Sequence, residues 1–215
     1  IASIPNGCDL DIFSTSSAHW RPEQVAQQDF MAIFTGTHGL ANGLNALIDV
    51  AIELQNRGRN DIKLVLVGDG MQKASLQSKV QELQLSNVVF HDPVNKEKLA
   101  SLMASADIGL QILANIPAFY YGTSPNKFFD YISAGLPVLN NYPGWLAELI
   151  KQENCGLTVP PENAVAFADA LVYATQNKEE LITMGHNAQQ LAKKQFDRKK
   201  LSHQFVEWVT KGERK

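Results

Sequence analysis

Short apolar runs alternate with longer amphipathic stretches from Met31 onward. The runs are compact and mostly free of charge, as strands buried on both faces of a sheet are. They predict strands over 31–36, 62–67, 88–90, 108–112, 138–140 and 157–159. The stretches between them have helical periodicity and predict helices over 40–57, 71–83, 96–105, 125–134 and 144–151. Repeated strand–helix units indicate an α/β fold with a doubly wound, mostly parallel six-stranded Rossmann-like sheet.

The two ends of the chain differ from this middle part. Three helical patterns, over 164–175, 178–194 and 198–209, predict extra C-terminal helices. The first 30 residues have weak periodicity, with a turn signal at Pro5-Asn6-Gly7 and a polar patch at 14–17. We therefore expect a linker over 1–30, a ligand-binding domain over 31–195 and a final helical segment over 196–215.

Composition narrows the class of protein. Of the 215 residues, 45% are hydrophobic and 19% are charged, as in ordinary globular proteins. Nineteen basic and 22 acidic side chains give a formal charge of −3, so nucleic acid is not expected as a partner. Cys8 and Cys155 are expected as reduced thiols of a cytoplasmic protein. The sequence has no apolar run of about 20 residues, so we expect no membrane span and no signal peptide. We also expect Ile1 to lie inside a longer natural chain or to follow processing.

The run from Ser124 to Val138 carries the strongest chemical signal. Ser124 is predicted to cap a helix, and Pro125 suits the first helical position because the N–H that proline lacks would be unpaired there. The free N–H groups and the dipole of such a helix start attract phosphates, and Lys127 adds a full positive charge. Asp130, near the same face, can accept hydrogen bonds from a pair of ribose hydroxyls. These groups together predict a nucleotide ligand.

The loops after the strands hold the other candidates, because ligands bind outside the carboxyl ends of strands in an open parallel sheet. The glycines of loop 36–43 are spaced G-x-x-G-x-x-x-G, which is not the dinucleotide fingerprint, yet they allow a diphosphate to approach the backbone. An ordinary turn is the alternative for this loop. His38 is expected on the surface, with a phosphate contact as its alternative. Lys73, after loop 67–70, faces either an anion or solvent.

Three further loops complete this edge of the predicted sheet. The backbone at Val94 can meet a base edge, although the residues alone indicate only a connector. Loop 113–123 is long and aromatic, with Tyr120 and Tyr121, and long loops at this edge are often functional. Loop 140–145 leads through Gly144 into another helix start. The sequence contains no metal-ligand spacing, P-loop or G-x-S-x-G elbow, so hydrolase and NTPase functions lose support.

Taken together, these loops resemble the carboxyl-terminal, donor-binding half of GT-B glycosyltransferases, in particular the retaining family 4. Segment 3–13 is similar to the I-P-N-G-V-D-x-x-x-F linker of such enzymes. Phe34-Thr35-Gly36 with Gly43-Leu44 resembles the first strand and loop, and 67–70 the second loop. Segment 125–138 is similar to the P-x-K-x-x-E-Y-M-A-x-G-x-P-V segment, and 124–131 resembles bacterial polysaccharide enzymes that transfer amino sugars.

The resemblance implies that 31–195 is a nucleotide-sugar donor domain. It would bind a nucleotide-diphosphate sugar, a UDP-sugar first of all, for retaining transfer of a hexosyl or N-acetylhexosaminyl group to a polysaccharide or lipid-linked acceptor, with no metal cofactor. The acceptor would bind through an N-terminal domain missing from this chain, so the fragment is expected to be inactive alone. Segment 196–215 would pack toward that domain, leaving Phe205 and Trp208 exposed here. The implied location is cytoplasmic, and peripheral contact of the full-length enzyme with the inner face of the membrane stays open.

The resemblance also assigns roles to single residues, although the catalytic residues stay unknown. It implies nucleotide or diphosphate contacts from Gly36, Thr37, Lys73, Val94, Ser124, Asn126, Lys127 and Asp130, and donor-sugar contacts from Tyr120, Tyr121 and Gly144. Asp130 stands where the family has a glutamate that binds the ribose, and Val94 would meet the base through its backbone.

Three departures from the family pattern change this picture. Thr37 and Asn42 stand where many members have an arginine and a lysine, so neutralisation of the diphosphate rests on Lys127, Lys73 and backbone N–H groups. Gly122 replaces a glutamate eight residues before Asp130. The sugar is then either held differently, by Tyr120 or Tyr121, or it lacks the hydroxyl that the glutamate recognises, as a deoxy-amino sugar would.

Other functions fit the sequence less well. A nucleotide-sugar 2-epimerase shares the GT-B architecture but needs an acid–base pair flanking the sugar, and the sequence offers no clear pair. A non-catalytic nucleotide-binding module of flavodoxin-like shape would not carry the linker segment 4–13. A dehydrogenase would need the dinucleotide fingerprint that loop 36–43 lacks.

Overall fold

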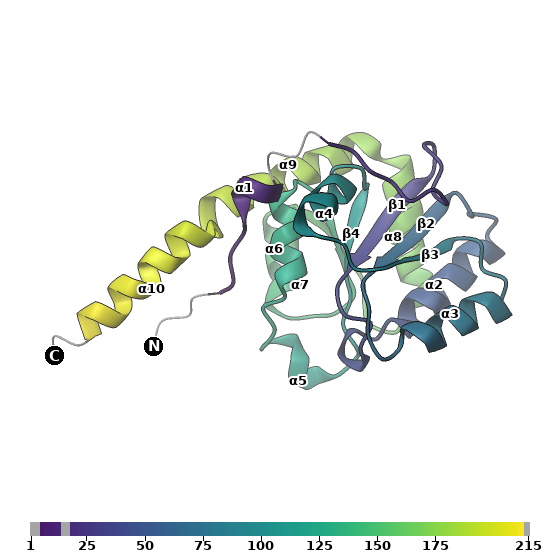
Figure 1. Ribbon diagram of the computed structural model, residues 1–215, viewed down its shortest axis with the longest axis horizontal. Coiled ribbons are helices and arrows are strands. Elements are labelled where there is room, and N and C mark those ends of the chain that lie inside the picture. Colours follow the sequence, from purple (N-terminus) through teal and green to yellow (C-terminus); the bar gives the residue numbers. More distant parts are fainter. Residues whose placement is uncertain (1–4, 14–17, 213–215) are drawn as a thin grey trace.

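Six parallel strands form the centre of the molecule (Figure 1). The structure is a computed structural model that describes residues 5–13 and 18–212. The strand order is β3-β2-β1-β4-β5-β6, and every neighbouring pair is parallel. This confirms the predicted doubly wound sheet. The strands are β1 (Phe30–Thr35), β2 (Ile62–Val67), β3 (Val88–His91), β4 (Ile108–Gln111), β5 (Val138–Asn140) and β6 (Gly156–Thr158).

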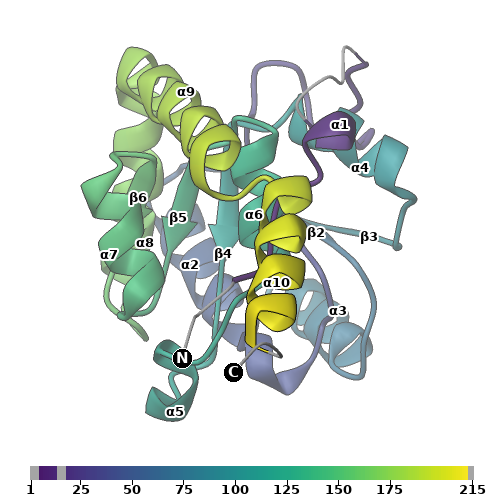
Figure 2. The same ribbon diagram turned by 90° about the vertical axis from the view of Figure 1, so that its left-hand side faces the viewer.

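Helices cover both faces of the sheet (Figures 1 and 2). Alternate residues of a strand point to opposite faces, so Met31 and Ile33 enter one core while Ala32 and Phe34 enter the other. The first core contains buried residues of α4 (Lys96–Met103), α6 (Asn126–Ser133), α7 (Trp145–Gln152) and α9 (Lys178–Gln195). The second contains buried residues of α2 (Asn45–Asn56), α3 (Lys73–Glu82) and α8 (Ala164–Gln176).

The predicted helix over 40–57 is interrupted near its start. A 3₁₀ turn, η1 (Leu40–Asn42), ends at Gly43, and α2 begins two residues later. Gly43 has a φ of +59°, and a Cβ there would lie 2.8 Å from the Cα of Ala114. The left-handed conformation and the close approach both require glycine, and helical periodicity alone does not reveal such a break.

The amino-terminal segment, predicted as a linker, is packed onto the domain where the structure describes it. It contains a short helix, α1 (Leu10–Phe13), that the sequence did not predict, and Phe13 is buried. The N–H of Cys8 donates to the Phe196 carbonyl at 2.6 Å, and the N–H of Arg198 donates to the Cys8 carbonyl at 3.2 Å. Residues 1–4, which begin the linker motif, and the polar patch at 14–17 lie outside the described residues.

The last helix, α10 (Arg198–Gly212), extends away from the sheet beside α1 (Figures 1 and 2). Its side chains from Ser202 to Thr210 are exposed. Phe205 is 53% exposed and Trp208 is 52% exposed, in agreement with the expectation for these two side chains. Among the described helices, none combines the length and apolar character that crossing a membrane requires.

Candidate functional site at the carboxyl edge of the sheet

The parallel register brings the carboxyl ends of three strands to one level. Thr35 of β1 lies opposite Val67 of β2, and Val67 lies opposite His91 of β3. The residues at and beyond these ends enclose a cavity of about 340 Å³. It is lined by Thr35, Gly36, Thr37, Val67, Gly68, Asp69, Pro93, Val94 and Leu99. The loops predicted to bind a nucleotide from β1, β2 and β3 therefore meet at one cavity.

The loops after β1 and β2 are in direct backbone contact. The N–H of Gly36 donates to the Val67 carbonyl at 3.0 Å, and the N–H of His38 donates to the Asp69 carbonyl at 2.8 Å. Gly68 has a φ of +150°, and a Cβ there would lie 1.9 Å from the Gly36 carbonyl oxygen. The N–H of Gly36 is thus already bonded. The N–H of Thr37 has no hydrogen-bond acceptor in the described part of the chain.

Tyr131 fixes α6 against the end of β1. Its hydroxyl accepts a hydrogen bond from the N–H of Thr35 at 3.0 Å and donates to the Ile33 carbonyl at 3.2 Å. The ring fits because Gly109 of β4 has no side chain; a Cβ there would lie 2.6 Å from it. The strand order reverses direction between β1 and β4, which is the position where open α/β sheets bind ligands. Because Tyr131 packs against both β1 and β4, α6 lies at this switch point.

The start of α6 differs from the prediction. The helix begins at Asn126, Pro125 occupies the N-cap position, and no described side chain caps it. The predicted cap by Ser124 is wrong because that residue contacts the amino-terminal segment: its hydroxyl accepts from the Asn6 N–H at 3.2 Å, and its carbonyl accepts from Asn6 Nδ2 at 2.6 Å. Asn126 is exposed at the first helical position.

Lys127 reaches from α6 to the loop after β1. Its ammonium donates to Asn42 Oδ1 at 2.7 Å and lies 4.4 Å from the ring centroid of Phe34. A Cβ at Gly36 would lie 3.4 Å from Lys127 Cε, so the lysine stem runs directly past that loop. Burial lowers the pKa of Lys127 to about 7. The structure brings together the lysine and the loop that the sequence placed 91 positions apart.

Asp130 follows Lys127 by three positions on α6 and is half-buried. Its carboxylate has no hydrogen-bond or ion-pair partner in the described part of the chain. Burial raises the pKa of Asp130 to about 6, against the opposing effects of Lys96 and Arg198. Those two cations instead pair with Asp9, at 2.7 Å and 2.9 Å. A partly buried acceptor without a donor is ready for a ligand that supplies hydroxyl groups.

Lys73 and Val94, the other two candidates on this side of the sheet, differ in how free they are to contact a ligand. The ammonium of Lys73 donates to the Gly68 carbonyl at 2.9 Å and to Asp92 at 2.5 Å, and its side chain is only 12% exposed. It is therefore neither a solvated lysine nor an unpaired cation. Val94 lines the cavity, and its contact with a base stays a prediction. Asn95 caps α4 by accepting from the Lys98 N–H at 2.9 Å.

Loop contacts that require glycine, a partly buried lysine and an unpaired carboxylate thus lie at the switch point. Sequence comparison gives the family. A family model described as "Glycosyl transferases group 1" matches residues 29–177. The chain belongs to the group 1 glycosyl transferases. This confirms the resemblance to the carboxyl-terminal domain of GT-B glycosyltransferases.

Known proteins similar to this chain are longer than it is. The O-antigen chain mannosyltransferase C of Escherichia coli is 25% identical over 203 residues, which are 94% of this chain and 51% of that protein. An uncharacterized glycosyltransferase of Methanocaldococcus jannaschii is 30% identical over 147 residues, which are 67% of this chain and 35% of that protein. The chain therefore spans about half the length of the mannosyltransferase and about a third of the archaeal relative.

A solved structure shares the fold. The crystal structure of Anabaena HepE in complex with UDP and glucose superposes with a TM-score of 0.76, at 19% identity, over 95% of this chain and 55% of that one. At this identity the likeness concerns the fold alone.

The donor-sugar candidates of this group 1 domain come from two segments, the end of α5 and the start of α7. Tyr120 ends the short helix α5 (Pro117–Tyr120), is buried, and stacks on Tyr142 with 6.2 Å between ring centroids. A Cβ at Gly144, the N-cap of α7, would lie 2.4 Å from the Tyr120 carbonyl oxygen. Tyr121 is 71% exposed. The structure thus brings Tyr120 and Gly144 together and leaves the Tyr121 ring open to solvent.

Sequence reasoning missed several buried polar groups at this edge. His38, expected on the surface, is fully buried between Phe34 and Phe90, and neither ring nitrogen has a partner among the described residues. Burial and the neighbouring Lys73 lower the pKa of His38. Gln111, which ends β4, is also buried, and it donates to the Tyr142 hydroxyl at 3.1 Å. The sequence did contain one signal for Gln111, since a polar residue at the end of an apolar run is a candidate for a buried polar group at a strand end.

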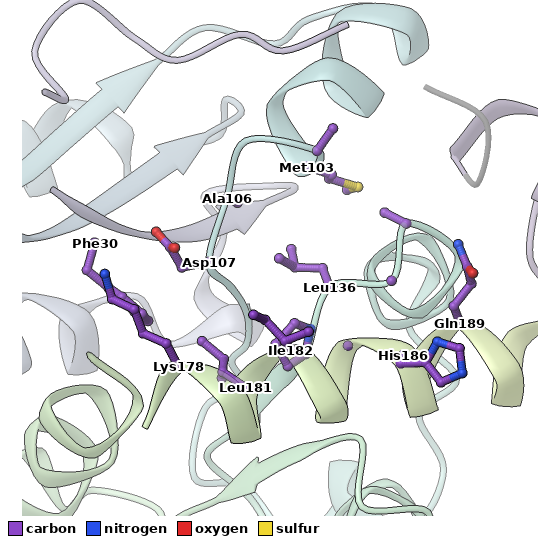
Figure 3. Close-up of a pocket in the computed structure, with 15 residues that line it drawn as sticks. Phe30, Met103, Ala106, Asp107, Leu136, Lys178, Leu181, Ile182, His186 and Gln189 are labelled. Atoms are coloured by element: carbon purple, nitrogen blue, oxygen red, sulfur yellow. The ribbon is translucent and has the colours of Figure 1, made fainter. Parts of the chain in front are cut away.

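A larger cavity of about 500 Å³ lies at the opposite, amino-terminal edge of the sheet. Figure 3 shows Asp107 and Lys178 on one side and Ile182 and His186 of α9 along the wall. The carboxylate of Asp107 accepts a hydrogen bond from the Met31 N–H at 2.6 Å. None of the predicted site residues lies here. Across the described residues, no group of His, Cys, Asp and Glu is arranged to hold a metal ion, and metal-independent chemistry stays a prediction.

Proposed function

We propose that this chain is the donor-binding domain of a retaining glycosyltransferase that uses a nucleotide-diphosphate sugar, with UDP as the expected nucleotide. The observation that carries the proposal is the pair of groups on α6: a partly buried ammonium directed at the loop after β1, and a half-buried carboxylate without a described partner. The first suits a diphosphate and the second suits the two ribose hydroxyls.

Each part of the donor has a matching group at this edge. The base would meet the backbone at Val94, which lines the cavity after β3. The ribose would donate to Asp130, and the diphosphate would lie between Lys127, the Thr37 N–H and the start of α6. When the sugar leaves the diphosphate, the positive charge of Lys127 and the helix dipole would stabilise the negative charge that develops there.

The transferred group and the acceptor belong to the same proposal. We expect a hexosyl or N-acetylhexosaminyl group, with Tyr121 and the Gly144 turn beside it, and a saccharide or lipid-linked acceptor. The acceptor would be bound by a further domain, so that these 215 residues bind the donor without turning it over. The complex of HepE with UDP and glucose and the name of the E. coli mannosyltransferase support a sugar-nucleotide donor.

Calorimetry with UDP tests the ribose assignment. Asp130→Ala should weaken UDP and uridine equally, by at least about thirtyfold, because two hydrogen bonds to a charged acceptor are lost. Asp49→Ala, which removes an exposed carboxylate on α2, is the matched control and should leave both affinities unchanged. Unchanged UDP affinity in Asp130→Ala would rule out the ribose role. Titration of UDP, GDP and ADP against the unaltered chain identifies the base.

A further inference from the structure

Asn42 lies in the centre of a chain of contacts that joins the loop after β1 to α6. Its side-chain oxygen accepts from the Lys127 ammonium at 2.7 Å. Its side-chain nitrogen donates to the Thr37 carbonyl at 2.7 Å. One amide group therefore contacts the lysine and the loop that the proposed function assigns to the same diphosphate.

The Lys127 ammonium is held without being neutralised. Asn42 Oδ1 is its hydrogen-bond acceptor, the Phe34 ring lies 4.4 Å away, and no described carboxylate pairs with it. Three other titratable groups lie near these loops. Lys73 pairs with Asp92, the buried ring of His38 has its pKa lowered, and the Asp69 carboxylate accepts a hydrogen bond from the Gly70 N–H at 2.8 Å. A neutral acceptor fixes the direction of the protonated ammonium without offsetting its charge, whereas a carboxylate would cancel that charge.

We propose that Asn42 is the positioning residue of Lys127, holding its ammonium beside the Thr37 backbone so that both groups act on one diphosphate. The inference rests on the proposed function, and it gives Asn42 a role despite its lack of charge. It also explains how a single lysine serves this site: a fixed, desolvated cation interacts with an anion more strongly than a mobile, hydrated one.

The affinities of UDP and uridine at pH 7 to 8 test this role in the 215-residue chain. The charge of UDP changes little over this range, because the second pKa of a terminal phosphate is about 6 and the uracil ring keeps its proton. Asn42→Ala should weaken UDP about tenfold, the effect of losing one hydrogen bond to a charged group, and leave uridine unchanged. In the unaltered chain, UDP affinity should fall as the pH rises above 7, because free Lys127 loses its proton there.

Asn42→Asp separates positioning from a general effect on the loop. A carboxylate beside the ammonium raises the pKa of Lys127, so the fall in UDP affinity should move to a higher pH. Asn45→Ala, three residues along and exposed, is the matched control and should leave affinities and pH profile unchanged. Melting curves check that every variant is folded. Asn42→Ala loses two hydrogen bonds of a partly exposed side chain and should be only slightly less stable.

Two outcomes overturn the inference alone: an unchanged ratio of UDP to uridine affinity in Asn42→Ala, or an unchanged pH profile in Asn42→Asp, while the unaltered chain binds UDP. Failure of the unaltered chain to bind UDP, GDP or ADP would instead contradict the proposed function, and the inference would fall with it.

Discussion

The two edges of the sheet differ in how their charged groups are satisfied. A cavity of about 500 Å³ lies at the amino-terminal edge, and one of about 340 Å³ lies at the carboxyl ends of β1, β2 and β3. There the carboxylate of Asp107 receives a backbone hydrogen bond from Met31, and Arg21 donates to the carbonyls of Ser105 and Asp29. At the carboxyl edge, Asp130 has no partner in the described part of the chain and Lys127 has only a neutral one.

This difference is why we propose that the ligand binds at the carboxyl edge. Burial shifts the pKa of both α6 groups toward their neutral forms, to about 6 for Asp130 and about 7 for Lys127, so each charge opposes folding. Functional sites characteristically keep such groups. Unsatisfied charge and loop contacts that require glycine, rather than cavity volume, are therefore our reasons for proposing the site at the carboxyl edge.

The largest expected effect on stability comes from a substitution that disrupts the contact between the loops after β1 and β2. Gly68→Ala should destabilise the chain by at least about 3 kcal/mol, because the new Cβ would overlap the Gly36 carbonyl oxygen, and should lower the melting temperature by about 6–12 °C. Gly122→Ala, where nothing lies within 4 Å of the added Cβ, should change stability by less than about 0.5 kcal/mol. Equal melting temperatures would mean that these loops are not locked together.

Substitution of Asp130 is expected to have a smaller effect on stability, and this effect is stabilising. Its folded-state pKa of about 6 lies above the ordinary value of 3.8, so the ionised carboxylate opposes folding above pH 6, and this penalty disappears as the pH falls toward 4. Asp130→Asn should therefore stabilise the chain by about 1–2 kcal/mol at pH 7.5 and by less than half as much at pH 4.5. Denaturant titrations at the two pH values measure this.

The same substitution sharpens the contrast between stability and function. Asp130→Asn should gain stability while it loses UDP affinity, as expected where a binding site retains an unfavourable charge. Asp49→Asn on the exposed face of α2 is the control and should show neither change. A destabilised Asp130→Asn chain would mean that the carboxylate has a structural partner rather than a ligand.

The sequence predicted the regular elements well. The predicted strands 62–67 and 138–140 match β2 and β5 residue for residue. Buried strands are short apolar runs between turn signals, so local sequence contains the information that defines them. The candidate loops and the proposed roles of Lys127 and Asp130 followed from the sheet rule and the family resemblance, and the structure places Lys127 beside the loop after β1.

What the sequence did not predict depends on contacts between distant residues. Ser124 fails to cap α6 because Asn6, 118 positions away, binds it. The break at Gly43 reflects the approach of Ala114, and the burial of His38 reflects its packing against Phe90. The amide that holds Lys127 lies 85 positions from it. The local sequence does not reveal such distant partners, so these details of the site could be seen only in the structure.

The measurement that tests the central claim most directly compares two lysines at opposite edges. UDP and uridine affinities are measured by calorimetry for Lys127→Met and for Lys178→Met, which alters the amino-edge cavity. We expect Lys127→Met to weaken UDP by at least about tenfold and leave uridine unchanged, because only UDP carries the diphosphate, and Lys178→Met to change neither. Equal losses of UDP and uridine in Lys127→Met, or a loss of UDP in Lys178→Met instead, would contradict a diphosphate site at the carboxyl edge.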